Sequence, residues 1–110
     1  MNPYIRFYKS HSGSSPVEQY LDSLEDSEAV PIFAALRHIE RHGLKRATVQ
    51  LRAIRGKLWE LKAGKHRVFY VLITGPELVL LHACKKQGQK ARRQDLALAQ
   101  ERMKEVLDSG

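Results

Sequence analysis

The sequence predicts an α+β fold: a small antiparallel β-sheet, an N-terminal helical hairpin on one face of the sheet, and a C-terminal helix. Apolar residues recur at helical spacing in two consecutive segments near the N-terminus and again near the C-terminus. Between these regions, short segments rich in β-branched and aromatic residues are separated by tight turns, which is typical of antiparallel strands. The 110 residues, 43% of them apolar, fit a single folded domain over residues 1–110.

The first two expected elements are a strand and a helix. Residues 4–8 combine β-branched and aromatic side chains, and a turn-rich stretch follows them. The helix starts at Ser15, because serine is a good N-cap and Pro16 suits the first helical position. Glu18 stands where a capping box needs a carboxylate. One face of this helix is formed by Val17, Tyr20, Leu21 and Leu24.

A second helix is expected to run to residue 42, where Gly43 stops it. Pro31 is tolerated only in a first turn, which places the start of the helix near Ser27 or Glu28. The short connection to the preceding helix predicts an antiparallel hairpin. The buried stripe of the second helix is assigned to Ala29, Val30, Phe33, Leu36 and Ile39.

Three strands are expected next, joined by short turns into an antiparallel meander. Residues 58–62 alternate between apolar and polar, residues 67–73 form a nearly continuous apolar segment typical of a central strand, and residues 78–84 form the next strand. Trp59 is expected in the core. The last helix covers residues 95–107, and its apolar side holds Leu96, Ala99, Met103 and Val106.

Positive charge is concentrated in the middle of the chain. The formal net charge is +7, and residues 37–93 hold fifteen Lys and Arg against three acids, whereas residues 1–28 hold more acids than cations. Such a distribution favours a polyanionic partner, above all nucleic acid. One cysteine excludes an internal disulfide. No apolar segment approaches the ~20 residues of a membrane span, so we expect a cytoplasmic protein with no membrane contact.

A basic loop follows the last expected strand. Lys62, Lys65, His66 and Arg67 belong to the neighbouring strands and their turn, so strand pairing would bring them close to this loop. We predict one cationic pocket suited to the phosphates of single-stranded RNA. A solvated basic loop without a ligand remains the alternative interpretation. The cations of the loop are Lys85, Lys86, Lys90, Arg92 and Arg93.

The histidines and the cysteine allow several interpretations. His82 lies inside an apolar strand, where a histidine is either a hydrogen-bonded core residue or a catalyst. His66 is expected on an exposed turn, where it could contact a phosphate or a 2′-hydroxyl. His38 and His42 share a helix face but lack a third ligand, so no metal site is predicted there. Cys84 is expected to be a small apolar residue.

Motifs for nucleotide binding, a nucleophile elbow and paired catalytic carboxylates are lacking in the sequence. If the protein cleaves a polynucleotide, we therefore expect a route without a metal or other cofactor. In that route the RNA 2′-hydroxyl attacks the adjacent phosphate, a side chain takes its proton, and cations stabilise the charge that develops on the phosphate oxygens.

A set of motifs carries a family resemblance. The motifs are Leu58–Lys62, Arg67–Tyr70, Leu80–Lys86, Lys90, Ala99 and Arg102. In their order they resemble the phage-derived, HigB-like branch of the RelE/ParE toxin superfamily, over nearly the whole chain. The resemblance implies a RelE-like fold and a toxin of a type II toxin–antitoxin pair, held inactive by a helix-turn-helix, HigA-like antitoxin. It also implies metal-free cleavage of mRNA in the ribosomal A site.

The resemblance also implies roles for individual residues. Arg67 matches the strand arginine that stabilises the transition-state phosphate, and Lys85 and Lys86 match the basic pair at the end of the last strand. The tyrosine base of RelE itself is replaced by leucine in this last helix, so His82 or His66 is expected to take its place. The residues expected to bind RNA are Lys62, Lys65, His66, Lys90, Arg92 and Arg93.

The predicted function is therefore that of a toxin that inhibits translation as a ribosome-dependent, metal-free mRNA endoribonuclease. Its expected partners are the ribosome, mRNA and the cognate antitoxin. Two alternatives stay open: a ParE-like inhibitor of DNA gyrase, and a non-catalytic nucleic-acid-binding module. All three interpretations require that Arg67 lies close to Lys85 and Lys86 in one positive pocket.

Overall fold

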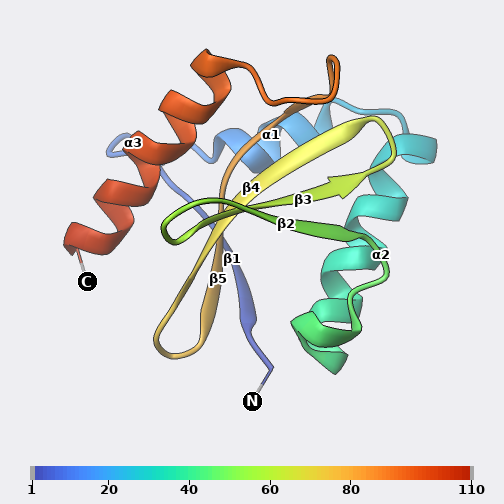
Figure 1. Cartoon of the computed structure of the whole chain (residues 1–110), viewed down its shortest axis with the longest axis horizontal. Coiled ribbons are helices and arrows are strands. Elements are labelled where there is room, and N and C mark those ends of the chain that lie inside the picture. The colour runs from blue at the N-terminus through green and yellow to red at the C-terminus, as the bar shows by residue number, and fades with distance from the viewer. Residues whose placement is uncertain (1, 110) are drawn as a thin grey trace.

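The computed structural model describes residues 2–109 and has an α+β fold with three α-helices around one five-stranded mixed sheet (Figure 1). Strand order across the sheet is β1-β5-β4-β3-β2. The elements are β1 (Tyr4–Phe7), α1 (Pro16–Asp22), α2 (Asp26–His42), the 3-10 turn η1 (Leu44–Arg46), β2 (Gln50–Arg55), β3 (Leu58–Ala63), β4 (His66–Ile73), β5 (Glu77–Lys85) and α3 (Arg93–Ser109).

The expected all-antiparallel sheet is wrong at one edge. Strands β2 to β5 form an antiparallel meander, but β1 pairs in parallel with β5, from Tyr4 opposite Glu77 to Phe7 opposite Leu80. Parallel neighbours need a long connection, and the segment with α1 and α2 supplies part of it. The meander also has one strand more than expected, because the segment before Gly56 pairs as β2 against β3.

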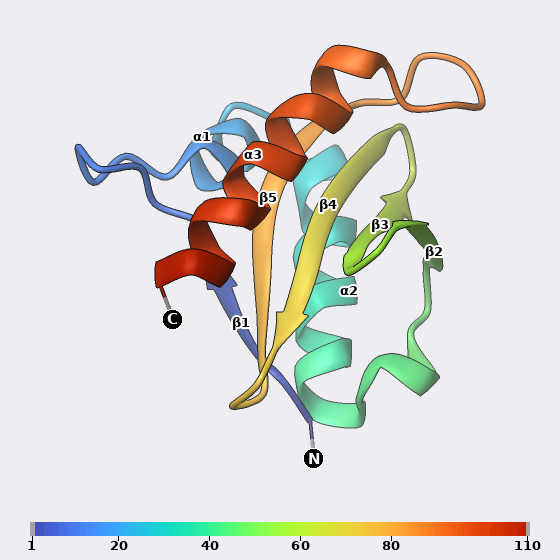
Figure 2. The same cartoon turned by 60° about the vertical axis from the view of Figure 1, so that its left-hand side comes forward.

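Helices cover both faces of the sheet. Figure 2 shows α3 in front of β4 and β5, and α2 behind them. Side chains alternate along a strand, so Val68 and Tyr70 of β4 join the core cluster with α1 and α2. Phe69 and Val71 join the cluster with α3. Two separate apolar layers therefore fix the sheet between the helices.

The predicted antiparallel helical hairpin is not confirmed. Helix α1 contacts β5, whereas α2 contacts β1, β3 and η1. Helix α2 begins at Asp26, so Pro31 lies in its second turn rather than its first. Val30 and Phe33 are 60% and 42% exposed, and the expected burial of these two residues is wrong. The buried stripe of α2 instead consists of Ala29, Ile32, Ala35, Leu36 and Ile39.

Some of the predicted local features are present in the structure and others are not. Gly43 ends α2 with a φ of 88°, a conformation that favours glycine. Ser15 precedes α1 as expected, but its buried hydroxyl makes no hydrogen bond, so the predicted capping box does not form. Trp59 is 39% exposed, which contradicts its expected core position. The last helix is confirmed, with Ala99 and Val106 buried. Among residues 2–109, no helix is long and apolar enough to cross a membrane.

Candidate nucleic-acid interface

Exposed cations gather at one end of the sheet, where β3 ends, β4 begins and β5 ends. We call this surface the cationic rim (Figure 1, the orange loop and the turn beside it). The backbone N–H of Lys86 donates to the carbonyl of Lys65 at 2.6 Å, which ties the basic loop to the β3–β4 turn. The rim therefore has a fixed base and exposed side chains, of which Arg92 also pairs with Asp95. Its cations are Lys65, Lys85, Lys86, Lys90, Arg92 and Arg93, all exposed.

Arg67 lies beneath the rim rather than on it. The residue is 1% exposed, and its Nη1 donates to Glu60 Oε2 at 2.6 Å. Its Nη2 donates to the carbonyl oxygen of Gly88 at 3.0 Å, while its buried Nε has no partner. Lys62 Nζ stands 3.9 Å from the other oxygen of Glu60. Two buried charges are tolerated here because they pair with each other.

Small cavities connect Arg67 with part of the predicted set. One of about 200 Å³ is lined by Arg67, Lys90 and Arg52, among others. An adjoining smaller hollow is lined by Arg67, Lys85, Lys90 and Arg92. The structure thus brings Arg67 together with three of the predicted cations, whereas Lys86 and Arg93 line neither cavity.

A larger hollow lies elsewhere. It measures about 950 Å³ and lies between β1 and the C-terminal end of α3. Its lining mixes cations such as Arg6 and Lys9 with the acids Glu105 and Asp108. Size alone does not select a site for a polyanion, and this mixed lining lacks the positive potential of the rim. We therefore place the candidate interface at the rim.

His66 differs from the sequence-based expectation. It is the first residue of β4 rather than part of a turn, and it is only 3% exposed. Because neighbouring side chains of a strand point to opposite faces, His66 and Arg67 are separated by the sheet. Its Nδ1 lies 2.7 Å from Tyr20 Oη, and its Nε2 lies 2.9 Å from Glu28 Oε1. The expected direct contact of His66 with RNA is not compatible with this burial.

Tyr20 and Glu28 were missed by the sequence analysis as site residues. They lie 46 and 38 residues from His66, on α1 and α2, and no spacing rule connects them. The hydrogen bond with His66 is the main cause that lowers the pKa of Glu28, and the charges of Lys65 and Lys85 lower it further. Burial is the main cause that raises the pKa of Tyr20.

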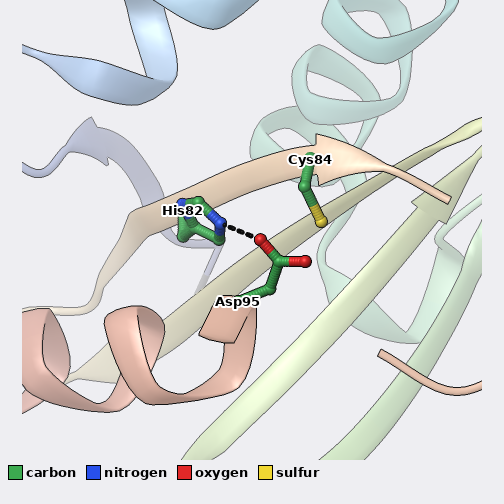
Figure 3. Close-up of side chains that lie close together, drawn as sticks. All are labelled: His82, Cys84 and Asp95. Atoms are coloured by element: carbon green, nitrogen blue, oxygen red, sulfur yellow. Dashed lines mark hydrogen bonds and ion pairs between the residues drawn. The ribbon is translucent and has the colours of Figure 1, made fainter. Parts of the chain in front are cut away.

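His82 takes part in a second network, on the α3 face of the sheet (Figure 3). Its Nε2 lies 2.8 Å from Asp95 Oδ1, and its Nδ1 lies 3.3 Å from Arg102 Nη1. The ring stacks on Phe69 with 13° between the planes. Both ring nitrogens are therefore engaged, and no free basic nitrogen faces solvent. Asp95, which orients His82, was not identified from the sequence.

The same region contains a group of potential metal ligands. The ligand atoms of His82, Cys84 and Asp95 lie within 4.8 Å of one another (Figure 3). Burial is the main cause that raises the pKa of Cys84 to about 12, so its thiol keeps its proton at neutral pH. Burial opposes ionisation of Asp95, but hydrogen bonds from His82 and Arg92 outweigh it and lower the pKa of this carboxyl.

These charges argue against a cation at this position. Asp95 is already paired, because Arg92 Nε donates to its Oδ2 at 3.1 Å. Arg67 and Arg92 lie close enough to affect the pKa of Cys84. A metal ion would have to displace a proton from the thiol, break the bond between His82 and Asp95, and stand among guanidinium groups. The cluster is better suited to holding β5 against α3 than to binding a metal.

Comparison with known families assigns the chain. A family model described as phage derived protein Gp49-like (DUF891) matches residues 19–104, which include α2, the rim and most of α3. The chain belongs to this family. Members of the Gp49-like family are toxins of toxin–antitoxin pairs, related to the RelE-like toxins, and the family implies an antitoxin partner. A comparison with curated proteins found no match.

Proposed function

We propose that the protein is a HigB-like toxin that cleaves ribosome-bound mRNA without a metal, as one domain acting in the cytoplasm. Its partners would be the ribosome, mRNA and a helix-turn-helix, HigA-like antitoxin. The observation that carries this proposal is the cationic rim: six exposed cations in the β3–β4 turn, at the end of β5, in the tethered loop and at the start of α3, directly above a buried arginine. Phosphate groups are the ligands that such a cluster of cations recognises best.

The exposure of each cation determines the role that we assign to it. Lys85, Lys86 and Lys90 are free to contact the scissile phosphate and to stabilise the negative charge that develops on its oxygens. Arg67 reaches a phosphate only after the carbonyl of Gly88 releases its Nη2. In this proposal RNA takes the place of that carbonyl. Lys62, Lys65, Arg92 and Arg93 hold the flanking phosphates.

A second candidate is a non-catalytic nucleic-acid-binding module. It is favoured by one specific observation: Arg67 is almost fully buried against Glu60, and both nitrogens of His82 are occupied. Under this alternative, the rim binds phosphates and nothing accelerates their chemistry. The two candidates differ in whether new RNA ends appear.

The test is primer extension on cellular mRNA after induction of the protein. We expect new 5′ ends within coding regions, and their loss in the Lys85→Ala/Lys86→Ala variant, whose two side chains are exposed. Loss of charge stabilisation should lower the cleavage rate about 100-fold or more. The matched control is Arg55→Ala/Lys57→Ala, at the opposite end of β3, which should cleave like the unsubstituted protein.

Two results would overturn endoribonuclease activity. Intact message together with DNA damage would indicate action on DNA gyrase. Intact message together with salt-sensitive RNA binding would indicate the non-catalytic module.

A further inference from the structure

A hydrogen-bonded chain of three side chains lies next to the cationic rim. Tyr20 from α1, His66 from β4 and Glu28 from α2 are joined by distances of 2.7 Å and 2.9 Å. The Tyr20 and His66 rings meet edge to face, with centroids 5.6 Å apart. His66 is buried, whereas Tyr20 is partly exposed. Tyr20 and Glu28 are therefore the two members open to solvent, and Tyr20 is the one that offers a hydroxyl to a bound molecule.

The hydrogen bonds determine where the protons lie. The Nε2 of His66 faces a carboxylate, so in the neutral ring this nitrogen carries the proton and donates it to Glu28. The Nδ1 is then the acceptor and receives the hydroxyl proton of Tyr20. A carboxylate, an imidazole and a hydroxyl in this order allow the imidazole to accept the hydroxyl proton and the carboxylate to stabilise the resulting imidazolium.

The surrounding charges place a phosphodiester beside this chain. Lys65 and Lys85 lie close enough to Glu28 to lower its pKa, and Lys85 is the strand partner of His66. Both lysines are exposed members of the rim. RNA held by these two cations would have its backbone beside Glu28 and His66, and Tyr20 is the partly exposed hydroxyl that His66 contacts. The side chains that contact the His66 ring are thus Tyr20 and Glu28, and Lys85 is its strand partner.

Tyr20 needs the histidine behind it. Burial raises the pKa of Tyr20, so its hydroxyl keeps its proton at neutral pH and cannot accept another unless it releases its own. His66 Nδ1 is the group that can receive the released proton. His82 offers no such route, since its Nδ1 faces Arg102 rather than a hydroxyl.

We propose that Tyr20, His66 and Glu28 form a proton relay that acts as the general base toward a ribose 2′-hydroxyl; this rests on the proposed RNA cleavage. The 2′-hydroxyl proton moves to Tyr20 Oη while the Tyr20 proton moves to His66 Nδ1. The 2′-oxygen bonds to phosphorus, and the bond from phosphorus to the 5′-oxygen breaks. That oxygen takes a proton from water, and the remaining hydroxide removes the extra proton from His66 through Tyr20.

The products are a 2′,3′-cyclic phosphate and a 5′-hydroxyl end. In this scheme Tyr20 is the catalytic residue, because it touches the substrate. His66 and Glu28 are positioning residues that hold and stabilise the transferred proton. The relay gives the general-base role to the α1 face of the rim, while Lys85 serves the same phosphate from β5.

The test measures single-turnover cleavage of mRNA on programmed ribosomes by Tyr20→Phe, a variant that loses only the hydroxyl. We expect the maximal rate to fall about 100-fold, in the range of general-base contributions, with half-saturation within about twofold. Glu28→Gln keeps an acceptor for His66 but removes the charge, so its rate should fall less than that of Tyr20→Phe. Thermal unfolding of each variant checks that the fold is retained.

The matched control is Tyr8→Phe, which removes a hydroxyl that bonds to Glu105 near the other end of α3 and should leave the rate unchanged. A Tyr20→Phe variant that is folded and cleaves at the unsubstituted rate overturns the relay and leaves the proposed function standing. A 2′-phosphate or 3′-phosphate formed directly, with no cyclic product, also overturns the relay. Lack of cleavage by the unsubstituted protein overturns both proposals.

Discussion

Two histidines on opposite faces of the sheet share one arrangement and differ in one contact. His66 and His82 both place Nε2 within 2.9 Å of a carboxylate, that of Glu28 or that of Asp95. The Nδ1 of His66 meets the hydroxyl of Tyr20, whereas the Nδ1 of His82 meets the guanidinium of Arg102. A hydroxyl can pass a proton at neutral pH, and a guanidinium cannot.

The comparison extends to the surroundings of each histidine. On the α3 face, His82 and Cys84 lie near the buried pair of Arg67 and Glu60, and α3 and the basic loop close this face except for a cavity of about 200 Å³. On the other face, His66 contacts the partly exposed Tyr20 and the half-exposed Glu28, and two exposed lysines lie near that carboxylate. The same histidine–carboxylate pair thus fixes structure on one face and leaves a route for a proton on the other.

Breaking the closed face should have the largest effect on stability. Glu60→Ala leaves the Arg67 guanidinium buried without its carboxylate, and such a loss costs about 3–5 kcal/mol of the free energy of unfolding. Urea unfolding followed by circular dichroism measures it. Glu28→Ala, on the open face, should have a much smaller effect because half-exposed Glu28 can be replaced by solvent.

The double variant Glu60→Leu/Arg67→Met separates charge burial from packing. It removes both charges and keeps apolar volume, so it should recover most of the lost free energy. A cost for Glu60→Ala below about 1 kcal/mol, the range of exposed ion pairs, would show that this face is open to water.

The position of the cationic rim could be predicted from the sequence, but the pairing of β1 at the edge of the sheet could not. A run of cations directly after a buried strand must begin at the end of the sheet, so Lys85 and its neighbours were placed correctly relative to the strand. The parallel pairing of β1 with β5 could not be predicted, because the strand pattern of residues 4–8 is equally compatible with either edge and either direction. Exposure of Val30 and Phe33 was missed because both fit an amphipathic pattern that is rotated around the helix axis.

The candidate site was only partly accessible to sequence reasoning. Arg67 was identified, but its partner Glu60 was not assigned to it, because the residue directly opposite Arg67 is Lys62 and Glu60 lies diagonally across the two strands. His66 was identified in the wrong environment, because the turn before it was expected to extend one residue further. Tyr20 and Asp95 acquire their roles only from the packing of α1 and α3, which no local pattern specifies.

The free energy of unfolding measured at several pH values tests the contribution of the His82–Asp95 pair. Because the folded-state pKa of Asp95 is lowered, its carboxylate contributes stability that is fully present above the ordinary pKa of about 3.9 and is lost as pH falls below it. The free energy of unfolding of Asp95→Asn should therefore lie below that of the unsubstituted protein at neutral pH. The difference should shrink as the pH falls through the acid range.

The control for this series is Asp108→Asn, an exposed position at the other end of α3. Its difference from the unsubstituted protein should stay near zero throughout. A gap for Asp95→Asn that stays constant down to low pH would mean that the substitution acts through packing and not through the charge.

The salt dependence of RNA binding tests the open face, and its expected change is the smallest of those predicted here. If Lys65 neutralises an RNA phosphate, Lys65→Gln removes one contact, and the slope of log Kd against log salt should fall by about 0.7, the value for one phosphate of a single strand. Fluorescence anisotropy with a short single-stranded RNA measures this slope. The control Lys57→Gln changes an exposed lysine in the turn before β3, at the end of this strand that lies away from the rim. It should leave the slope unchanged. Equal changes of the slope for both variants would mean that RNA binding depends on the net charge alone. The position of a lysine at one end of the sheet or the other would then not affect binding.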